Sequence, residues 1–305
     1  MNRIQFSIEA QRAIARELVD GAILWVIGGG TAAALLEFLM RRRGFILTVL
    51  ELHDESRYYQ FALARVSSRA AVITACEPTR AKIMKLWWRL PEVPIVIPNK
   101  PYSSLPRRNH PGSSPELSQQ IARLDGKNIV LYQGLLTPER DLRPFAMAIG
   151  AMPEITLAIM GADTGGYMDE ILALDPTAIH IPYFEPPQHL EITSNAYIGI
   201  ATYEDQSLNS MFCAPNKVYE YGGLSIPMVC NKAPGLTLGV AAAGAAICVE
   251  TNDQREIQHG LQHVINNYSA FSSAAREFYD STDVGALISR VASLAISADA
   301  RHHDH

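Results

Sequence analysis

The sequence predicts an α/β protein built from two parallel sheets, each covered by helices. Short apolar runs alternate with helical stretches along the whole chain, which is typical of parallel strands joined by helical crossovers. The first four runs are AILWVI, FILTVLE, AAVITA and IVIPN. Six more follow in the second part of the chain: NIVLYQG, ITLAIMG, AIHIPYF, AYIGIA, IPMVC and AAICVE.

A polar segment divides these two groups of strands. The stretch from Tyr102 to Gln119, YSSLPRRNHPGSSPELSQ, is rich in Pro, Ser and Arg, a composition that favours a linker over a helix or strand. A chain of 305 residues is long enough for two domains of ordinary size. We therefore expect a first domain at residues 1–105, a linker at 106–118 and a second domain at 119–305.

Composition excludes some classes of function. The formal net charge is -5 and 19% of the residues are charged, so the chain has no basic field suited to nucleic acid. The four cysteines are scattered without a C-x-x-C pair, which favours reduced core thiols and a cytoplasmic location, with a metal site or a disulfide as the alternatives. They are Cys76, Cys213, Cys230 and Cys248.

The segment from Gly21 to Met40 has the apolar character of a membrane span and is followed by three arginines. A span would not carry three glycines at its centre and a glutamate, Glu37, within it. We expect a strand, a glycine turn and an amphipathic helix here instead.

The same glycine turn supports an alternative function. Gly28, Gly30 and Ala33 satisfy the pattern G-x-G-x-x-A after a strand, and Glu51 closes the next apolar run, where a ribose-binding acid belongs in a dinucleotide fold. FAD or NAD binding is therefore an alternative. The pattern stands alone, because no later segment has the character of a flavin or nicotinamide enzyme.

The stretch SLNSMFCAPNKVYEYGGLSIP, Ser207 to Pro227, gathers polar side chains before the buried run IPMVC. Asn209, Asn216, Lys217 and Glu220 stand where the chain enters a helix. Helix entries in α/β sheets bind anions and ribose hydroxyls, because backbone N–H groups and the positive end of the helix dipole face the ligand. Glu220 is suited to two ribose hydroxyls and Lys217 to a phosphate.

Four segments, in this order and spacing, resemble the GT-B glycosyltransferases, and specifically the retaining enzymes of glycosyltransferase family 4. They are VLYQGLLTPERDLRPF (Val130–Phe145), PEITLAIMGAD (Pro153–Asp163), IHIPYFEPPQHLEITSNAYIGI (Ile179–Ile200) and PNKVYEYGGLSIPMV (Pro215–Val229). The resemblance implies two Rossmann-like domains facing a cleft. It also implies transfer of a hexosyl unit from a nucleotide-sugar donor to a glycan or lipid-linked acceptor, as in polysaccharide biosynthesis.

The resemblance further implies that neither a metal nor a cofactor is needed, and the chain lacks an Asp-x-Asp motif. It assigns catalytic roles to His53, at the donor sugar, and to Arg140 and Lys217, at the diphosphate. A guanidinium suits this role because it meets phosphate in a bidentate fork. The donor-binding residues that it implies are Gly134, Tyr183, Phe184, Asn209, Asn216 and Glu220.

The chain departs from the family in two ways that matter. Phe212 occupies the position of a family glutamate, so that sugar contact comes from Asn209 or Asp205, or is absent. Only about a hundred residues precede the linker, fewer than in a family N-terminal domain, so we expect that domain to be incomplete. A non-catalytic role as the partner subunit of a complete transferase is therefore a third hypothesis.

A basic helical stretch, RAKIMKLWWRLP from Arg80 to Pro91, carries Trp87 and Trp88. Aromatic and basic residues on one helix favour a peripheral contact with a membrane surface, here the inner face of the membrane. Burial of at least one of the two tryptophans in the core is the competing interpretation.

Overall fold

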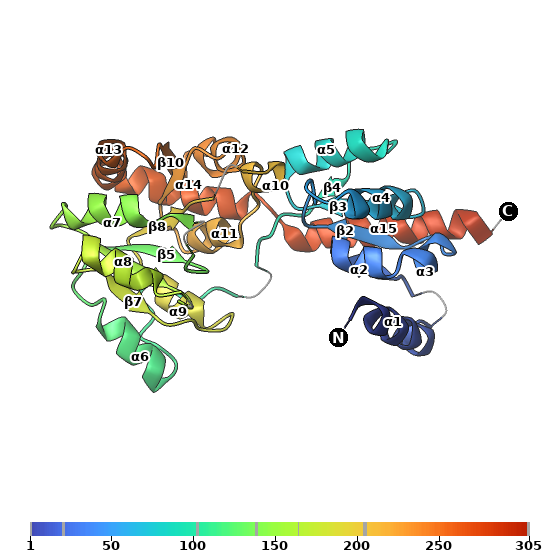
Figure 1. Ribbon diagram of the computed structural model, residues 1–305, viewed down its shortest axis with the longest axis horizontal. Helices are drawn as coiled ribbons and strands as arrows, with labels where there is room; N and C mark the ends of the chain where they lie inside the picture. Colours follow the sequence, from blue (N-terminus) through green and yellow to red (C-terminus); the bar gives the residue numbers. More distant parts are fainter. Residues whose placement is uncertain are drawn as a thin grey trace. The chain divides into compact units, whose positions relative to one another are not determined.

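The computed structural model describes residues 2–19, 22–101, 104–137, 140–163, 165–203 and 206–303. The chain divides into two compact units. Unit 1 comprises Met1–Pro98, Gln206–Ala214 and Asp283–His305, and unit 2 comprises Asn99–Asp205 and Pro215–Thr282. Figure 1 shows the elements of both units along the chain.

Unit 1 contains a four-stranded parallel sheet in the order β1-β2-β3-β4, so each strand pairs with its neighbour in sequence. The strands are β1 (Trp25–Ile27), β2 (Ile46–Val49), β3 (Val72–Ala75) and β4 (Ile95–Val96). The connecting helices are α2 (Gly29–Ala34), α3 (Leu36–Met40), α4 (Arg57–Ser67) and α5 (Pro78–Trp88). The expected strand and glycine turn are thus confirmed, but two short helices, α2 and α3, replace the single amphipathic helix that was expected. No helix in the described ranges is long and apolar enough to span a membrane.

Helices cover both faces of the unit 1 sheet (Figure 1). On one face α2, α4 and α5 form a core with β1–β3. On the other face α15 (Val284–His303) contacts β2 and β3, where Val291 and Ala295 pack on Ile46 and Val72. The helix α1 (Arg3–Glu17) contacts α2 and begins at a capping box on Asn2.

Unit 2 contains a six-stranded parallel sheet in the order β10-β9-β8-β5-β6-β7. The strands are β5 (Ile129–Gln133), β6 (Thr156–Met160), β7 (Ile179–Ile181), β8 (Ile198–Ala201), β9 (Met228–Asn231) and β10 (Ala246–Val249). The chain builds from β5 toward β7, then returns to place β8 on the other side of β5. The order of the strands therefore reverses between β5 and β8, which is the topological switch point of a doubly wound sheet.

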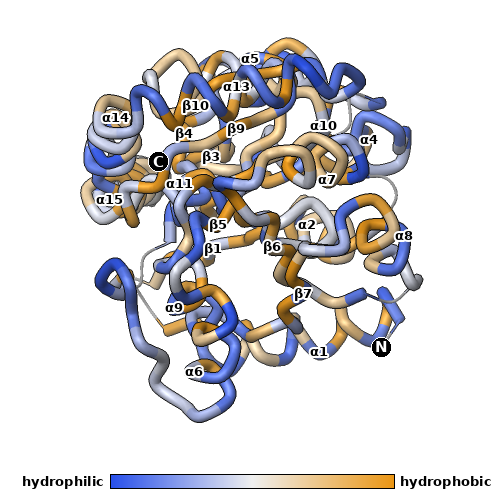
Figure 2. The backbone as a smooth tube through the Cα atoms, turned by 90° about the vertical axis from the view of Figure 1, so that its left-hand side faces the viewer, coloured by the Kyte–Doolittle hydropathy of each residue, from blue (hydrophilic) through white to orange (hydrophobic). Residues whose placement is uncertain are grey.

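Two layers of helices enclose the unit 2 sheet. The helices α7 (Arg143–Gly150), α8 (Tyr167–Leu174) and α13 (Gln254–Asn266) belong to the main core with β5, β6 and β8–β10. The helix α11 (Asn216–Gly223) contacts β8 and α14 (Tyr268–Asp280). Gly199 of β8 lacks a side chain where the Tyr221 ring packs, since an added Cβ would lie 2.5 Å from that ring. Figure 2 shows hydrophobic colour along strands such as β6 and β9.

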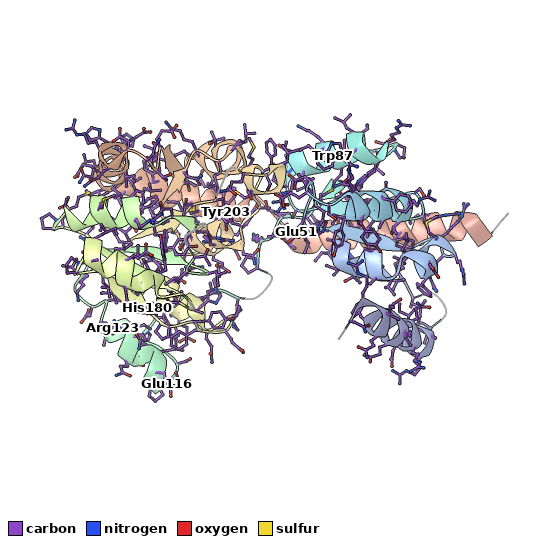
Figure 3. The ribbon with its side chains drawn as sticks, viewed as in Figure 1. Glu51, Trp87, Glu116, Arg123, His180 and Tyr203 are labelled. Carbon is purple, nitrogen blue, oxygen red and sulfur yellow. The ribbon has the colours of Figure 1, made fainter. Side chains whose placement is uncertain are left out.

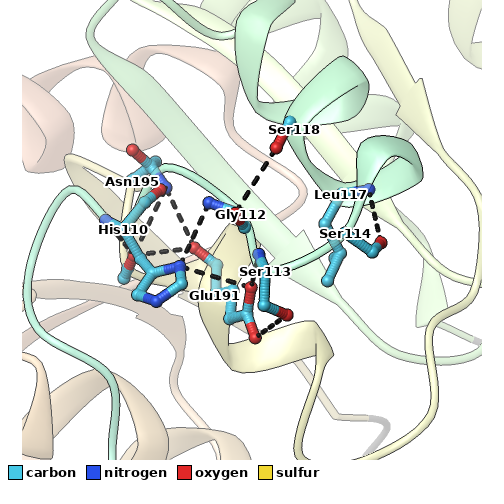
Figure 4. A network of polar contacts seen from close by, with 9 residues as sticks. His110, Gly112, Ser113, Ser114, Leu117, Ser118, Glu191 and Asn195 are labelled. Carbon is cyan, nitrogen blue, oxygen red and sulfur yellow. Dashed lines mark hydrogen bonds and ion pairs between the residues drawn. The ribbon is translucent and has the colours of Figure 1, made fainter.

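The segment expected as a linker is bound to unit 2. Glu191 of α9 (His189–Thr193) accepts hydrogen bonds from the backbone N–H (2.7 Å) and hydroxyl (2.8 Å) of Ser113, and Asn195 donates to the His110 carbonyl over 3.0 Å (Figure 4). Ser114 then caps α6 (Pro115–Ala122). These contacts place residues 104–114 with the second sheet.

The division of the chain differs from the expected one in two further places. Unit 1 ends at Pro98 instead of residue 105, and it recovers residues 206–214 and 283–305 from the part assigned to the second domain. The recovered segments are α10 (Leu208–Met211), which binds the loop after β2, and α15.

Candidate functional site

The candidate site of unit 2 lies where the chain leaves the carboxyl ends of β5 and β8. These two strands are neighbours across the switch point, and doubly wound sheets bind their ligands at that point, outside the carboxyl ends of the strands. Gly134 and Arg140 follow β5, whereas Tyr203, Lys217 and Glu220 follow β8. The fold therefore brings together five residues that are up to 86 positions apart in the sequence.

Two cations surround a pair of tyrosine rings at this point. The Lys217 ammonium lies 4.1 Å from the centre of the Tyr132 ring and 5.5 Å from that of Tyr203. The Arg140 guanidinium lies 4.9 Å from the centre of the same Tyr203 ring. Figure 3 labels Tyr203. Ring faces attract cations, so the rings hold two positive charges near each other in a half-buried environment. Such an arrangement is suited to an anion.

The charge states of these groups follow from their surroundings. Burial raises the pKa of Tyr132, although the nearby Arg140 opposes that shift. Burial acts to lower the pKa of Arg140, but Tyr203 and Tyr132 outweigh it and raise that pKa. Tyr132 is therefore neutral, and its hydroxyl donates to the Leu135 carbonyl over 3.2 Å. Arg140 keeps its positive charge.

Gly134 lets the backbone turn directly beside these cations. Its φ of 143° lies in the region that disfavours residues with a side chain. An added Cβ would lie 3.3 Å from both the Lys217 ammonium and the Tyr132 hydroxyl. A side chain at this position would therefore crowd the ammonium, which is itself buried.

Glu220, in α11, is held by a chain of polar side chains. Its carboxylate accepts a hydrogen bond from Gln133 Nε2, and its Oε1 lies 3.4 Å from His189 Nε2. Gln133 in turn accepts from the Thr193 hydroxyl over 2.6 Å. A carboxylate offers about four lone-pair positions, so these two contacts fix its orientation and leave capacity for further donors.

The remaining predicted donor-binding residues of unit 2 lie at the start of α11 and after β7. Asn216 is the exposed first residue of α11. Tyr183 and Phe184 follow β7, which β6 separates from β5 in the sheet. The Tyr183 side chain is exposed and Phe184 is half-buried, so Tyr183 is not part of the core.

His53 lies in unit 1, in the loop after β2. Its ring stacks on Tyr59 with centroids 4.4 Å apart, and its Nδ1 lies 3.8 Å from Glu51. The backbone of His53 has a φ of 51°, and Gln60 donates to its carbonyl over 3.1 Å. The other side of the ring contacts the glycine turn, since a Cβ on Gly29 would lie 2.2 Å from His53 Nε2. Packing thus fixes the ring in one orientation.

Asn209 also lies in unit 1 and supports the same loop. Its side-chain oxygen accepts from the Leu52 backbone N–H over 3.0 Å, and its carbonyl accepts from Arg80 over 2.5 Å. Asp54 accepts from the backbone N–H of Leu208, at the start of α10, over 2.6 Å. The four polar residues of the stretch from Ser207 to Pro227 therefore belong to two helices. Asn209 belongs to α10 of unit 1, and the other three belong to α11 of unit 2.

The glycine turn of the alternative function stands at the edge of its sheet. In a dinucleotide fold the strand before such a turn is central, whereas β1 is the outer strand of the order β1-β2-β3-β4. The His53 ring occupies the space next to Gly29. The sheet order of unit 1 thus differs from that of a dinucleotide-binding domain.

Sequence reasoning missed several residues of the unit 2 site. Gln133 is a polar side chain near the end of the apolar run NIVLYQG. A polar residue at the end of a strand indicates a binding site there, so this residue could have been found from the sequence. His189 and Tyr203 have no comparable signal, because their contacts depend on elements distant in sequence. Asn231 was also missed: it donates to the Tyr203 carbonyl over 2.6 Å and accepts from the Tyr203 N–H over 3.0 Å.

The sequence matches no protein-family model and none of the curated proteins compared with it. The structure, in contrast, is similar to solved structures across nearly its whole length. Anabaena Alr3699/HepE, solved in complex with UDP, superimposes with a TM-score of 0.68 at 15% identity, over 95% of this chain and 82% of that one.

Two further solved structures show how widely this architecture is used. WaaG, a glycosyltransferase involved in lipopolysaccharide biosynthesis, gives a TM-score of 0.62 at 12% identity, over 94% of this chain and 80% of that one. A putative UDP-N-acetylglucosamine 2-epimerase from Listeria monocytogenes gives 0.61 at 12%, over 90% and 73%. The chain therefore has an α/β fold with two parallel sheets, shared with GT-B glycosyltransferases, and at these identities the likeness shows the fold alone.

Proposed function

We propose that this protein binds a nucleotide-sugar and transfers its sugar to an acceptor. The observation that carries the proposal is the pairing of Lys217 and Arg140 around the Tyr203 ring at the switch point of unit 2. Two cations beside a backbone turn that has no side chain, at Gly134, suit a diphosphate, and the oriented carboxylate of Glu220 suits the ribose hydroxyls. The UDP complex of HepE, a protein of the same fold, supports this class of ligand.

The chemical roles follow from where charge develops in the reaction. As the bond from sugar to diphosphate breaks, negative charge grows on the leaving phosphate. Arg140 and Lys217 supply positive charge there from the chain itself, so we propose a reaction that needs neither a metal ion nor a cofactor. Asn216, at the first position of α11, and the segment with Tyr183 and Phe184 are proposed to contact the donor, the latter at its base.

The finer assignments rest on the sequence resemblance. We propose a hexosyl transfer with retention of configuration, as in glycosyltransferase family 4, to a glycan or lipid-linked acceptor of polysaccharide biosynthesis. On the same resemblance His53 and Asn209 would serve the donor sugar. The packing of the His53 ring between Tyr59 and Gly29 supports a positioned side chain, while the contacts of Asn209 favour a structural role in that loop.

A peripheral membrane contact is proposed from the helix α5. Trp87, which Figure 3 labels, is 40% exposed. Leu86 is 76% exposed, and Lys82 is exposed on the same helix. Trp88 is buried and donates to Gln60 over 2.9 Å, so one tryptophan packs in the core and the other faces outward. An outward aromatic residue beside lysines suits an anionic lipid surface, and we propose a cytoplasmic protein acting at the inner face of the membrane.

A second candidate function is that of a non-catalytic partner subunit. The observation that favours it is β1 at the edge of the unit 1 sheet, where Ile27 is 55% exposed. An apolar strand edge of this kind pairs readily with another chain. A partner subunit of this kind would bind the donor weakly or not at all. The other alternative, FAD or NAD binding, would depend on Gly28 and Gly30.

A thermal-shift screen distinguishes these candidates. UDP-, GDP- and CMP-sugars are compared with NAD and FAD at equal concentrations, and a ligand at a hundred times its Kd stabilises the folded state by about 2.7 kcal/mol. We expect one class of nucleotide-sugar to raise the melting temperature. A rise with NAD or FAD alone, or no rise with any of these ligands, would contradict the proposal.

A further inference from the structure

Two cysteines face each other across neighbouring strands of unit 2. Cys230 lies in β9 and Cys248 in β10, and they are direct partners in the parallel register. Register partners point to the same face of a sheet, and neighbouring strands are about 4.8 Å apart. A disulfide needs its two Cα atoms about 4.4–6.8 Å apart, so the sheet itself provides the required spacing.

The surroundings of the two thiols are unequal. Cys230 is fully buried, whereas Cys248 is partly exposed. A hydrogen bond with Cys230 lowers the pKa of the Cys248 thiol to about 7, outweighing the effect of burial, and contacts with Thr237 and Lys232 act in the same direction. The Thr237 hydroxyl lies 3.7 Å from the Cys248 sulfur.

The charged groups near this thiol are also defined. Lys232, one residue beyond β9, forms ion pairs with Glu250 (3.3 Å) and Glu256 (2.9 Å). These carboxylates hold the lysine beside the end of β10, where its positive charge favours the thiolate form of Cys248. A thiol that is both accessible and partly ionised at neutral pH is the form that reacts with oxidants.

We propose that Cys230 and Cys248 form a reversible redox pair, with Cys248 as the thiol that hydroperoxides oxidise first and Cys230 as the thiol that resolves it. Neither thiol belongs to the residues proposed to bind the nucleotide-sugar.

The chemistry balances in two steps. The Cys248 thiolate attacks one oxygen of hydrogen peroxide and breaks the O–O bond, which gives a sulfenic acid on Cys248 and hydroxide, protonated to water. The Cys230 sulfur then attacks the Cys248 sulfur and loses its proton, and the S–O bond breaks with release of a second water. One peroxide is reduced for each disulfide formed, and a dithiol reductant restores both thiols.

The remaining two cysteines are internal controls. Cys76 is buried, donates to the Leu50 carbonyl over 3.1 Å, and has a pKa raised by that burial. Cys213 is buried as well, and both lie in unit 1. Neither shares a strand register with another cysteine in the described sheets.

The test uses the full chain, treated with one equivalent of hydrogen peroxide and then with N-ethylmaleimide, followed by trypsin and mass spectrometry without reduction. Cleavage after Lys217, Lys232 and Arg255 puts Cys230 in residues 218–232 and Cys248 in residues 233–255. We expect these two peptides to be linked and dithiothreitol to release them. Hydrogen peroxide should oxidise Cys248 at least about tenfold faster than Cys76 or Cys213.

Two variants separate the roles of the thiols. In Cys230→Ser, Cys248 should stop at the sulfenic acid and be trapped by dimedone, whereas Cys248→Ser should leave Cys230 as a free thiol. The proposal is overturned if both peptides of the wild type carry maleimide after peroxide treatment, if Cys76 or Cys213 reacts first, or if disulfides join separate chains. The wild-type measurement decides the matter even if either variant fails to fold.

Discussion

The Lys217 ammonium and the Arg140 guanidinium share the ring of Tyr203, at 5.5 and 4.9 Å from its centre. The two cations come from loops that follow different strands, β8 and β5, which are neighbours only because the sheet order reverses between them. Like charges repel, so this arrangement is favourable when an anion is bound between them. The relationship explains why the switch point of unit 2 is the part of the molecule best suited to a diphosphate.

Removing the carboxylate of Glu220 should abolish most donor affinity without unfolding the protein. Loss of a charge-assisted pair of hydrogen bonds to ribose costs about 2–4 kcal/mol, or about thirtyfold to a thousandfold in Kd. Calorimetric titration of UDP into Glu220→Ala measures this loss. Glu250→Ala, which removes an exposed carboxylate of the same unit, is the control.

A modified ligand shows whether that loss concerns the ribose. 2′,3′-Dideoxy-UDP lacks the hydroxyls proposed as partners of Glu220. The wild type should therefore bind it more weakly than UDP, and Glu220→Ala should bind both nucleotides equally. Unchanged UDP affinity in Glu220→Ala would show that this carboxylate does not hold the ribose.

Arg140→Lys separates the shape of the guanidinium from its charge. The lysine keeps the charge and loses the bidentate fork, so turnover should fall far more than UMP affinity does. Slow hydrolysis of the nucleotide-sugar gives a turnover that needs no acceptor. Arg143→Lys, at an exposed arginine paired with Asp141 at 2.8 Å, should leave hydrolysis unchanged. Equal hydrolysis by the wild type and Arg140→Lys would move the diphosphate contact to Lys217.

Gly134→Ala tests the need for an open turn. A side chain at a φ of 143° costs on the order of 1–3 kcal/mol, and the new methyl group would crowd the Lys217 ammonium. We expect a lower melting temperature together with weaker UDP binding. Gly165→Ala, where an added Cβ meets nothing within 4 Å, is the matched control. Stability and affinity equal to the wild type would show that the turn tolerates a side chain.

Asn231→Ala tests how Tyr203 is held in place. The Asn231 side chain donates one hydrogen bond to the Tyr203 backbone and accepts another from it, and net losses of about 0.5–1.5 kcal/mol per bond are usual. UDP affinity should fall several-fold, because both cations depend on the position of that ring. Asn266→Ala, at the end of α13, should bind as the wild type does. If Asn231→Ala lowers the melting temperature alone, Asn231 stabilises the fold without positioning the site.

The elements of the fold were predictable because their signals are local. Each apolar run proposed as a strand contains a strand, from AILWVI to AAICVE, and the glycines at 28–30 lie where the first strand is followed by a helix. The placement of Asn209 was not predictable from the same evidence. Its neighbours in sequence belong to a short helix that binds the Leu52 loop, and such a contact depends on residues 157 positions away.

The candidate site was predictable only where its signals are local in the sequence. Lys217 and Glu220 follow a recognisable helix entry, so their positions in α11 could be inferred. The partners that orient them could not, because Tyr132, His189 and Tyr203 become neighbours only when the sheet forms in its reversed order. Polar residues at the ends of apolar strands, such as Gln133, are the most useful signal of this kind.

The most direct test of the central claim is calorimetric titration of nucleoside diphosphates into the wild type, Lys217→Met and Lys232→Met. Methionine keeps the apolar stem and removes the charge, and Lys232 is an exposed lysine of the same unit paired with Glu250 and Glu256. We expect the wild type and Lys232→Met to bind one diphosphate equally, and Lys217→Met to bind it at least about thirtyfold more weakly. Equal affinities in all three proteins, or no binding of UDP, GDP or CDP by the wild type, would contradict a diphosphate site at the switch point of unit 2.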